Sequence, residues 1–132
     1  MKELNEKVVE LLNSTELWWI GTNGEEPNVV PVGFKEIAED GKLIVGVLHL
    51  NTTLANLEKD NRIAVSVCSG KTMVGYQIKG TAKFVAEGKY ADKCKEISSK
   101  MFSGKMSTRG VIEITPEKVI NTTPGPKNNT EL

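Results

Sequence analysis

Threonine and asparagine side chains gather just after an apolar run near the middle of the chain. Residues 43–48, LIVGVL, are short, apolar and β-branched, which predicts a buried strand. Thr52 and Thr53 then open a segment with the spacing of a short amphipathic helix. A strand that runs into a helix start leaves backbone N–H groups unpaired beside the positive end of the helix dipole, which suits a phosphate. The two hydroxyls, with the Asn56 amide one turn further on, could add donors to such a site.

The same segment has a simpler interpretation, in which Asn51 or Thr52 is the N-cap of the helix. Helices commonly begin at Ser, Thr or Asn because the side-chain oxygen accepts an N–H of the first turn. Taken alone, the pattern favours capping over phosphate binding, and both interpretations stay open.

Composition narrows the class of protein. A chain of 132 residues fits one domain, expected here at residues 1–121, followed by a flexible tail at 122–132 that is rich in Pro, Gly and Asn. The net charge of +0 argues against a nucleic-acid partner, and no apolar run approaches a membrane span. Small molecules or proteins are the expected partners. The first residues alternate charged and apolar side chains at helical spacing, unlike a signal peptide.

Cys68 and Cys94 lie in no CxxC pattern, so neither a redox motif nor a metal site is expected. They are interpreted as buried free thiols in a reducing, cytoplasmic compartment. No Ser-His-Asp set, carboxylate pair or metal-ligand set can be assembled from the remaining residues, and the catalytic residues stay unknown. His49, the one histidine, could exchange a proton near neutral pH or be structural. Trp18 and Trp19 are consecutive in a strand, so they should face opposite ways, one into the core and the other toward a dimer interface or a ligand.

The hydropathy pattern predicts a mainly β protein with flanking helices. Helices are expected at residues 2–13, in the short segment after Asn51 or Thr52 that carries Leu54, Leu57 and residues 58–60, and at 89–102. The last has an apolar stripe of Tyr90, Cys94, Ile97, Met101 and Phe102. Strands are expected at residues 17–22, 28–37, 43–48, 63–68, 73–85 and 111–115, with a possible short one at 119–120 after a turn at Pro116. Within the second strand, Pro31 and Gly33 indicate an open edge or the close approach of a ligand. About six strands joined mainly by hairpins predict a closed or partly closed antiparallel barrel.

Four motifs in this order resemble the pyridoxamine 5′-phosphate oxidase-like family of FMN-binding split barrels. They are IGTNGEEPNVVPV at 20–32, TLANL with NRIAV at 53–57 and 61–65, YQIKGTA at 76–82, and ITPEKV at 114–119. The resemblance covers most of the domain and implies a six-stranded antiparallel split β-barrel of Greek-key type with short helices. It also implies a homodimer, with FMN in a groove between the two identical subunits.

The family resemblance assigns a position along the cofactor to each matching residue. It places Pro31, Val32 and Gly33 along the edge of the flavin ring, with Gly33 allowing close approach of the backbone, and Gly46, Val47, Leu48 and His49 along the ring from the neighbouring strand. Thr52, Thr53 and Asn56 would hold the phosphate, which agrees with the interpretation of the helix start made above.

One departure concerns Thr52, which stands where many relatives have Lys. The phosphate then loses its usual point charge, and Lys59, Arg62, Lys79 or a residue of the second subunit could replace it. The departure leaves open weaker FMN binding or a different phosphorylated cofactor.

The resemblance therefore implies a small FMN-dependent oxidoreductase that transfers electrons or hydride between a small-molecule donor and acceptor. Pyridoxamine phosphate oxidation itself is not expected, because the chain is short and has no Arg- or Lys-rich set for a second phosphorylated ligand. The alternatives are a deazaflavin- or haem-binding relative on the same fold, and a non-enzymatic FMN- or ligand-binding module.

Overall fold

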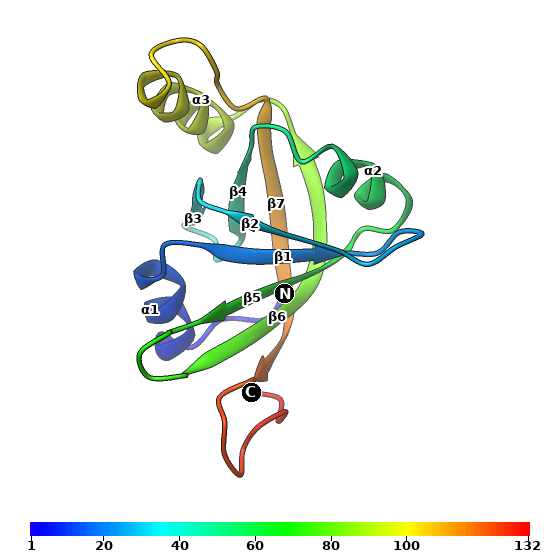
Figure 1. Cartoon of the computed structure of the whole chain (residues 1–132), viewed down its shortest axis with the longest axis vertical. Helices are drawn as coiled ribbons and strands as arrows, with labels where there is room; N and C mark the ends of the chain where they lie inside the picture. The colour runs from blue at the N-terminus through cyan, green and yellow to red at the C-terminus, as the bar shows by residue number, and fades with distance from the viewer.

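Seven strands form one antiparallel sheet in the computed structural model, which describes residues 1–132 (Figure 1). The sheet order is β2-β1-β5-β6-β7-β4-β3. The strands are β1 (Trp18–Thr22), β2 (Asn28–Val32), β3 (Lys35–Ile37), β4 (Leu43–Val47), β5 (Arg62–Cys68), β6 (Gly75–Val85) and β7 (Gly110–Asn121). The mainly β fold predicted from the sequence is confirmed, with seven strands in place of six.

The connection between β2 and β3 explains why the sheet curls into a split barrel. These strands lie at opposite edges of the sheet, yet only Gly33 and Phe34 separate them in the chain. Two residues can bridge roughly 10 Å, so the two edges must come close together. The prediction of one strand over 28–37 was therefore wrong, because the chain leaves one edge after Val32 and joins the other at Lys35.

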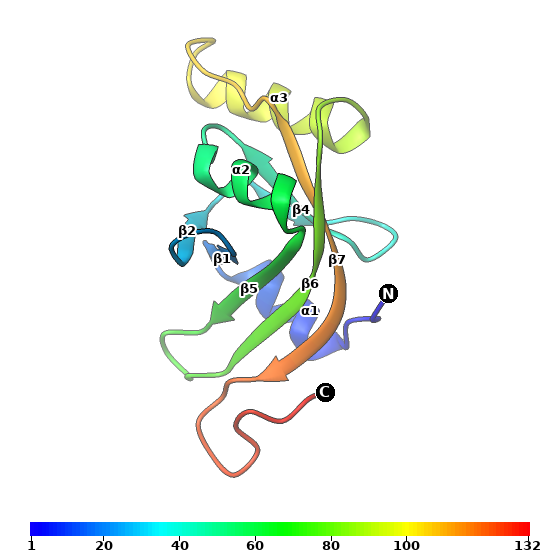
Figure 2. The ribbon, with the colours of Figure 1, turned by 90° about the vertical axis from the view of Figure 1, so that its right-hand side faces the viewer.

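β6 and β7 are the longest strands and run side by side along most of the length of the molecule (Figure 2). The predicted turn at Pro116 is absent, because β7 runs through it without interruption. Pro116 lies opposite Gly80, at a shift in the register between the two strands. Such a bulge accommodates a proline, which cannot donate a ladder hydrogen bond.

Three helices flank the sheet: α1 (Glu6–Ser14), α2 (Asn51–Lys59) and α3 (Lys89–Met101). α1 begins later than predicted, at Glu6, and its N-cap is Asn5, whose Oδ1 accepts a hydrogen bond from Val8 N at 3.0 Å. Leu12 of α1 is fully buried, and its carbonyl accepts the Trp18 Nε1–H bond at 3.0 Å. The two tryptophans face opposite ways as predicted, with Trp18 1% exposed and Trp19 46% exposed. No helix is long and apolar enough to cross a membrane.

The C-terminal segment folds back beside the end of β7. Asn129 N donates to Asn121 O at 2.7 Å, and Leu132 N donates to Val119 O at 2.9 Å. In both views this segment lies at the end of the molecule opposite α2 and α3 (Figures 1 and 2). Its flexibility stays a prediction from composition.

The bulge makes Gly80 a sensitive position. A Cβ there would lie 2.0 Å from Thr115 O, a backbone atom that can move only with β7. We expect Gly80→Ala to lower the free energy of unfolding by about 1–3 kcal/mol, measured by urea denaturation. Gly70→Ala is the matched control, because a Cβ at Gly70 meets nothing within 4 Å and should change stability by less than about 0.5 kcal/mol. Equal effects of the two substitutions would contradict this assignment.

Candidate functional site

A cavity of about 640 Å³ lies at the seam where the two edges of the sheet meet. Its walls come from the β2–β3 connection, from β4 and the residues after it, and from α3. Six of the residues singled out in the sequence line it: Pro31, Val32, Gly33, Gly46, Leu48 and His49. Phe34, Lys35, Glu36, Ile44, Leu50, Tyr90, Lys93, Cys94, Ile97, Met101 and Phe102 complete the lining. Residues assigned to the flavin ring from two separate stretches therefore meet in one apolar cavity.

α3 contributes one wall of this cavity. The apolar stripe predicted for this helix lines the cavity, and Ile97 and Met101 are 47% and 63% exposed. Phe102 packs edge-on against Phe34, with 6.1 Å between the ring centroids. An apolar stripe at helical spacing does not reveal whether it covers a core or a cavity.

Polar contacts hold α3 over β3 and the turn after it. Lys93 Nζ lies 2.7 Å from Glu36 Oε2, and Lys89 Nζ lies 3.1 Å from Glu39 Oε1. The hydrogen bonds to these carboxylates raise the pKa of both lysines. The Tyr90 hydroxyl accepts a hydrogen bond from Glu39 N at 3.0 Å. Because most of these groups are exposed, the contacts orient the helix more than they stabilise the fold.

Gly46 faces α3 directly. A Cβ at this position would lie 2.4 Å from Cys94 Sγ and 2.8 Å from Phe34 Cβ. The absence of a side chain therefore lets the chain's own helix approach β4. Gly33 differs, since its nearest neighbour would be Leu17 Cδ2 at 3.7 Å, which leaves room beside its backbone for a ligand.

The two thiols have different environments. Burial raises the pKa of the Cys94 thiol. Cys94 is half-buried, whereas Cys68 is exposed at the end of β5. The expectation of two buried thiols was wrong for Cys68. Successive side chains of a strand face opposite ways, and the buried positions of β5 are Ile63, Val65 and Val67, so Cys68 faces outward.

Lys35 brings a positive charge to the cavity. Its Nζ donates to Thr15 O at 2.7 Å and lies 5.1 Å from the centroid of the Trp18 ring. Partial burial lowers the pKa of this lysine. His49 lies at the exposed rim.

The start of α2 differs from the predicted cap. Leu50 is the N-cap residue, with φ of 45°, and no side chain caps the helix. Asn51 and Thr52 are thus not caps, and the N–H groups of Asn51, Thr52 and Thr53 have no acceptor in the chain. Asn51 Oδ1 instead accepts a hydrogen bond from Arg109 Nη2 at 3.1 Å.

The remaining predicted residues lie outside the apolar cavity. Val47 is fully buried in the barrel core. Thr53 is 1% exposed, and its hydroxyl accepts a hydrogen bond from Asn28 Nδ2 at 2.9 Å. Asn56 Nδ2 donates to Thr22 Oγ1 at 3.0 Å, so its amide ties α2 to β1. Thr52 and Asn56 line a second recess of about 630 Å³ between α2 and the β1–β2 turn.

Known proteins with a similar sequence or fold agree with the family resemblance of the motifs. A family model described as pyridoxamine 5′-phosphate oxidase matches residues 4–123. The chain belongs to this family. An uncharacterized protein of Methanocaldococcus jannaschii is 28% identical over 128 residues, which cover 94% of this chain and 84% of that protein.

Two solved structures have a fold similar to that of this chain. HupZ of Group A Streptococcus is 24% identical, with a TM-score of 0.76 over 92% of this chain and 96% of that one. An FMN-binding protein of Syntrophomonas wolfei is 18% identical, with a TM-score of 0.76 over 91% of this chain and 86% of that one. At this level of identity, the likeness shows the fold alone.

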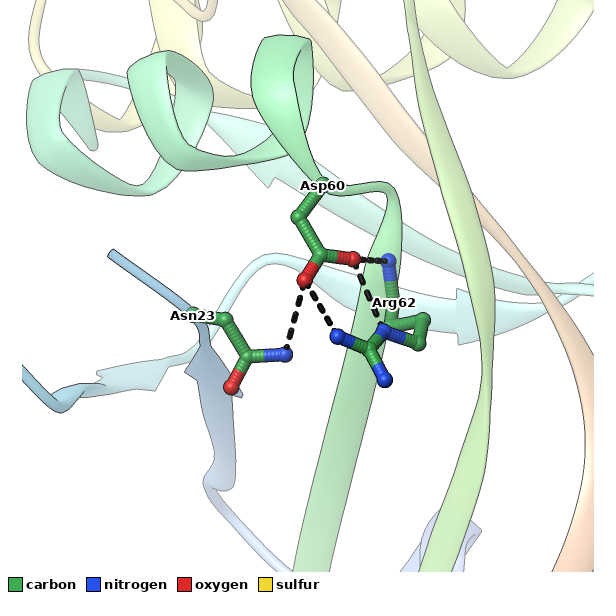
Figure 3. A network of polar contacts seen from close by, with 3 residues as sticks. All are labelled: Asn23, Asp60 and Arg62. Carbon is green, nitrogen blue, oxygen red and sulfur yellow. Dashed lines mark hydrogen bonds and ion pairs between the residues drawn. The ribbon is translucent and has the colours of Figure 1, made fainter.

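Two of the basic residues considered for the phosphate, Arg62 and Lys59, have different surroundings. Arg62 Nε and Nη2 donate to the two Asp60 carboxylate oxygens at 2.9 and 2.7 Å, and Asn23 Nδ2 donates to the same carboxylate at 3.2 Å (Figure 3). These contacts join the end of α2 to β5 and to the β1–β2 turn. Lys59 lines the second recess among Glu25, Glu26 and Asp60, so that recess carries more negative than positive charge.

The Asp60 contacts predict a pH-dependent stability. The hydrogen bond from Arg62 holds the pKa of Asp60 well below its usual range. A depressed carboxyl pKa stabilises the fold above the unfolded-state pKa of about 4, and this stabilisation is lost progressively as the pH falls below that value. We therefore expect wild type to exceed Asp60→Asn in urea stability by a constant margin between pH 5 and 8.

Below about pH 4 the margin between the two proteins should shrink. Asp40→Asn is a suitable control, since Asp40 is exposed and its ion pair with Lys42 at 3.6 Å is loose. If the difference in urea stability between wild type and Asp60→Asn did not change with pH, the ionised Asp60 carboxylate would not be the source of the stabilisation.

Proposed function

We propose that this protein is a homodimeric flavoprotein that binds FMN non-covalently and transfers electrons or hydride through it. The observation that carries the proposal is the seam cavity, in which six of the residues assigned to the flavin ring meet. Its volume of about 640 Å³ is within the usual range for small-molecule sites, about 300–1,000 Å³.

The cavity walls match the chemistry of a flavin ring. Apolar side chains of β4 and α3 suit the flat faces of the ring, while Lys35, His49 and Lys93 supply polar atoms to its edges. Family membership and the FMN-binding protein of similar fold support the choice of FMN.

The start of α2 matches the chemistry of a phosphate. His49 and Leu50 line the cavity, and the three unpaired N–H groups of residues 51–53 follow at once in the chain. Backbone N–H donors at a helix start favour an anion through both hydrogen bonding and the helix dipole. The ring and phosphate positions are thus neighbours along the chain.

Bound FMN would supply the redox chemistry of the reaction. The residues of the chain would bind and orient the ring, with α3 excluding water from one side of it. His49 lies at the rim, where an imidazole can hydrogen-bond the ring edge or exchange a proton with a substrate near neutral pH. The small-molecule donor and acceptor would reach the ring through the open side of the cavity.

Exposed apolar side chains support the homodimer. Leu17, Trp19 and Val29 are 44%, 46% and 63% exposed; Trp19 and Val29 lie on the paired strands β1 and β2, and Leu17 comes two residues before Trp19. Ile97 and Met101 are exposed at the cavity itself. A second copy that covered these side chains would remove apolar surface from water and close the cavity.

The proposal predicts that the purified protein retains added FMN, with a flavin absorption spectrum after free cofactor is removed. Gly33→Phe should weaken retention at least tenfold, because the new ring would fill the cavity while its Cβ meets no close neighbour. Gly70→Phe is the control and should bind as wild type, because a Cβ at Gly70 meets nothing within 4 Å and Gly70 lies outside the cavity.

Equal FMN retention by the two variants would place the flavin elsewhere. A protein that retained no FMN but took up a deazaflavin or haem would show a different cofactor on the same fold. Tight FMN binding without turnover by any reduced nicotinamide and acceptor would favour the non-enzymatic binding module.

The homodimer predicts a sedimentation mass of twice the 14.4 kDa chain mass. Trp19→Lys should shift the protein toward the monomer, because it places a charge among the exposed apolar side chains of β1 and β2. Leu132→Lys is the control, since Leu132 is 40% exposed and lies beside β7, three places from β1 in the sheet order. A monomeric wild type would refute the dimer.

A further inference from the structure

We infer that Arg109 supplies the positive charge that selects a phosphorylated flavin over riboflavin. The inference rests on the proposed FMN site and identifies the residue that takes the place of the lysine absent at Thr52. Arg109 directly precedes β7, far in sequence from the helix start that it contacts.

The Arg109 guanidinium lies at the start of α2. Its Nη2 donates to His49 O and, at 3.1 Å, to Asn51 Oδ1. The two acceptors flank Leu50, the cap residue of the helix, and Asn51 also carries the first of the three unpaired N–H groups. One cation and three backbone donors are therefore gathered beside the cavity rim formed by His49 and Leu50.

The charge of Arg109 is available for a ligand. An arginine carries five N–H donors, and only Nη2 is used in the chain, so Nε and Nη1 remain free. No carboxylate lies within ion-pair distance of it, in contrast to Arg62, which pairs with Asp60. Asn51 and the His49 carbonyl orient the guanidinium without neutralising it.

The backbone fixes Arg109 in this place. Arg109 N donates to Val47 O at 2.8 Å, which continues the pairing of β4 with β7. The preceding residue, Thr108, is 2% exposed, and its N donates to Ser98 Oγ of α3 at 2.9 Å. Because the backbone N–H groups of Thr108 and Arg109 are both hydrogen-bonded, the point from which the Arg109 side chain extends to the start of α2 is fixed.

FMN carries a phosphate that riboflavin lacks. A guanidinium at the phosphate position therefore predicts that the protein binds FMN more tightly than riboflavin. Charge-assisted hydrogen bonds from a planar guanidinium to phosphate oxygens are among the stronger polar contacts in proteins. We expect Arg109→Ala to weaken FMN binding by about tenfold to a hundredfold and to leave riboflavin binding within about twofold, both measured by flavin fluorescence titration.

Two further variants separate charge from structure. Arg109→Ala combined with Thr52→Lys should recover most of the FMN affinity, because a lysine returns to the position where many relatives have one. Lys127→Ala removes a positive charge from the C-terminal segment, at the opposite end of the molecule (Figure 1), and should change neither affinity. Raising the ionic strength should weaken FMN binding to wild type more than to Arg109→Ala.

The outcomes distinguish this inference from the proposed function. A wild type that binds FMN and riboflavin equally would overturn the role of Arg109 and leave the flavin site standing. Equal loss of both flavins in Arg109→Ala would show a purely structural role and also overturn the inference. A wild type that binds neither flavin would refute the proposed function, and the inference with it.

Discussion

The pairing of β4 with the first residues of β7 is the interaction on which the candidate site depends. Val47 lies opposite Gly110, so the segment before β7 is placed against the residues that follow β4. Through this pairing, α3 comes to lie over Gly46, and Arg109 reaches the start of α2. Figure 2 shows the consequence, with α2 and α3 at the same end of the long strands. The pairing of β4 with β7 thus positions both α3, which forms a wall of the cavity, and Arg109, which lies beside the cavity.

The two-residue connection from β2 to β3 provides the second constraint. It forces opposite edges of the sheet together, and the cavity lies at the seam that results. Edge strands have unpaired backbone groups, and Pro31 on β2 removes one donor from such an edge. A ligand or a second copy of the chain can approach this seam, because no further strand covers it.

The polar residues around α2 divide into two groups with different tasks. Thr53 and Asn56 turn toward β1 and β2, where their contacts with Asn28 and Thr22 fix the helix to the sheet. The exposed N–H groups at the helix start remain free and have Arg109 beside them. Leu50, the N-cap residue, has no side chain that accepts a hydrogen bond from the first turn of α2. A side-chain cap would occupy N–H donors that an anion would otherwise use.

The sequence by itself determined the strand periodicity, the antiparallel class, the opposite faces of Trp18 and Trp19, and the family. These follow from local rules, since alternation along a strand and short turns are encoded in neighbouring residues. Only the tertiary structure decided that 28–37 splits into two edge strands, that α3 lines a cavity, and that Arg109 meets His49 and Asn51. These features depend on pairings between distant segments, such as that of β4 with β7, which spacing along the chain does not encode.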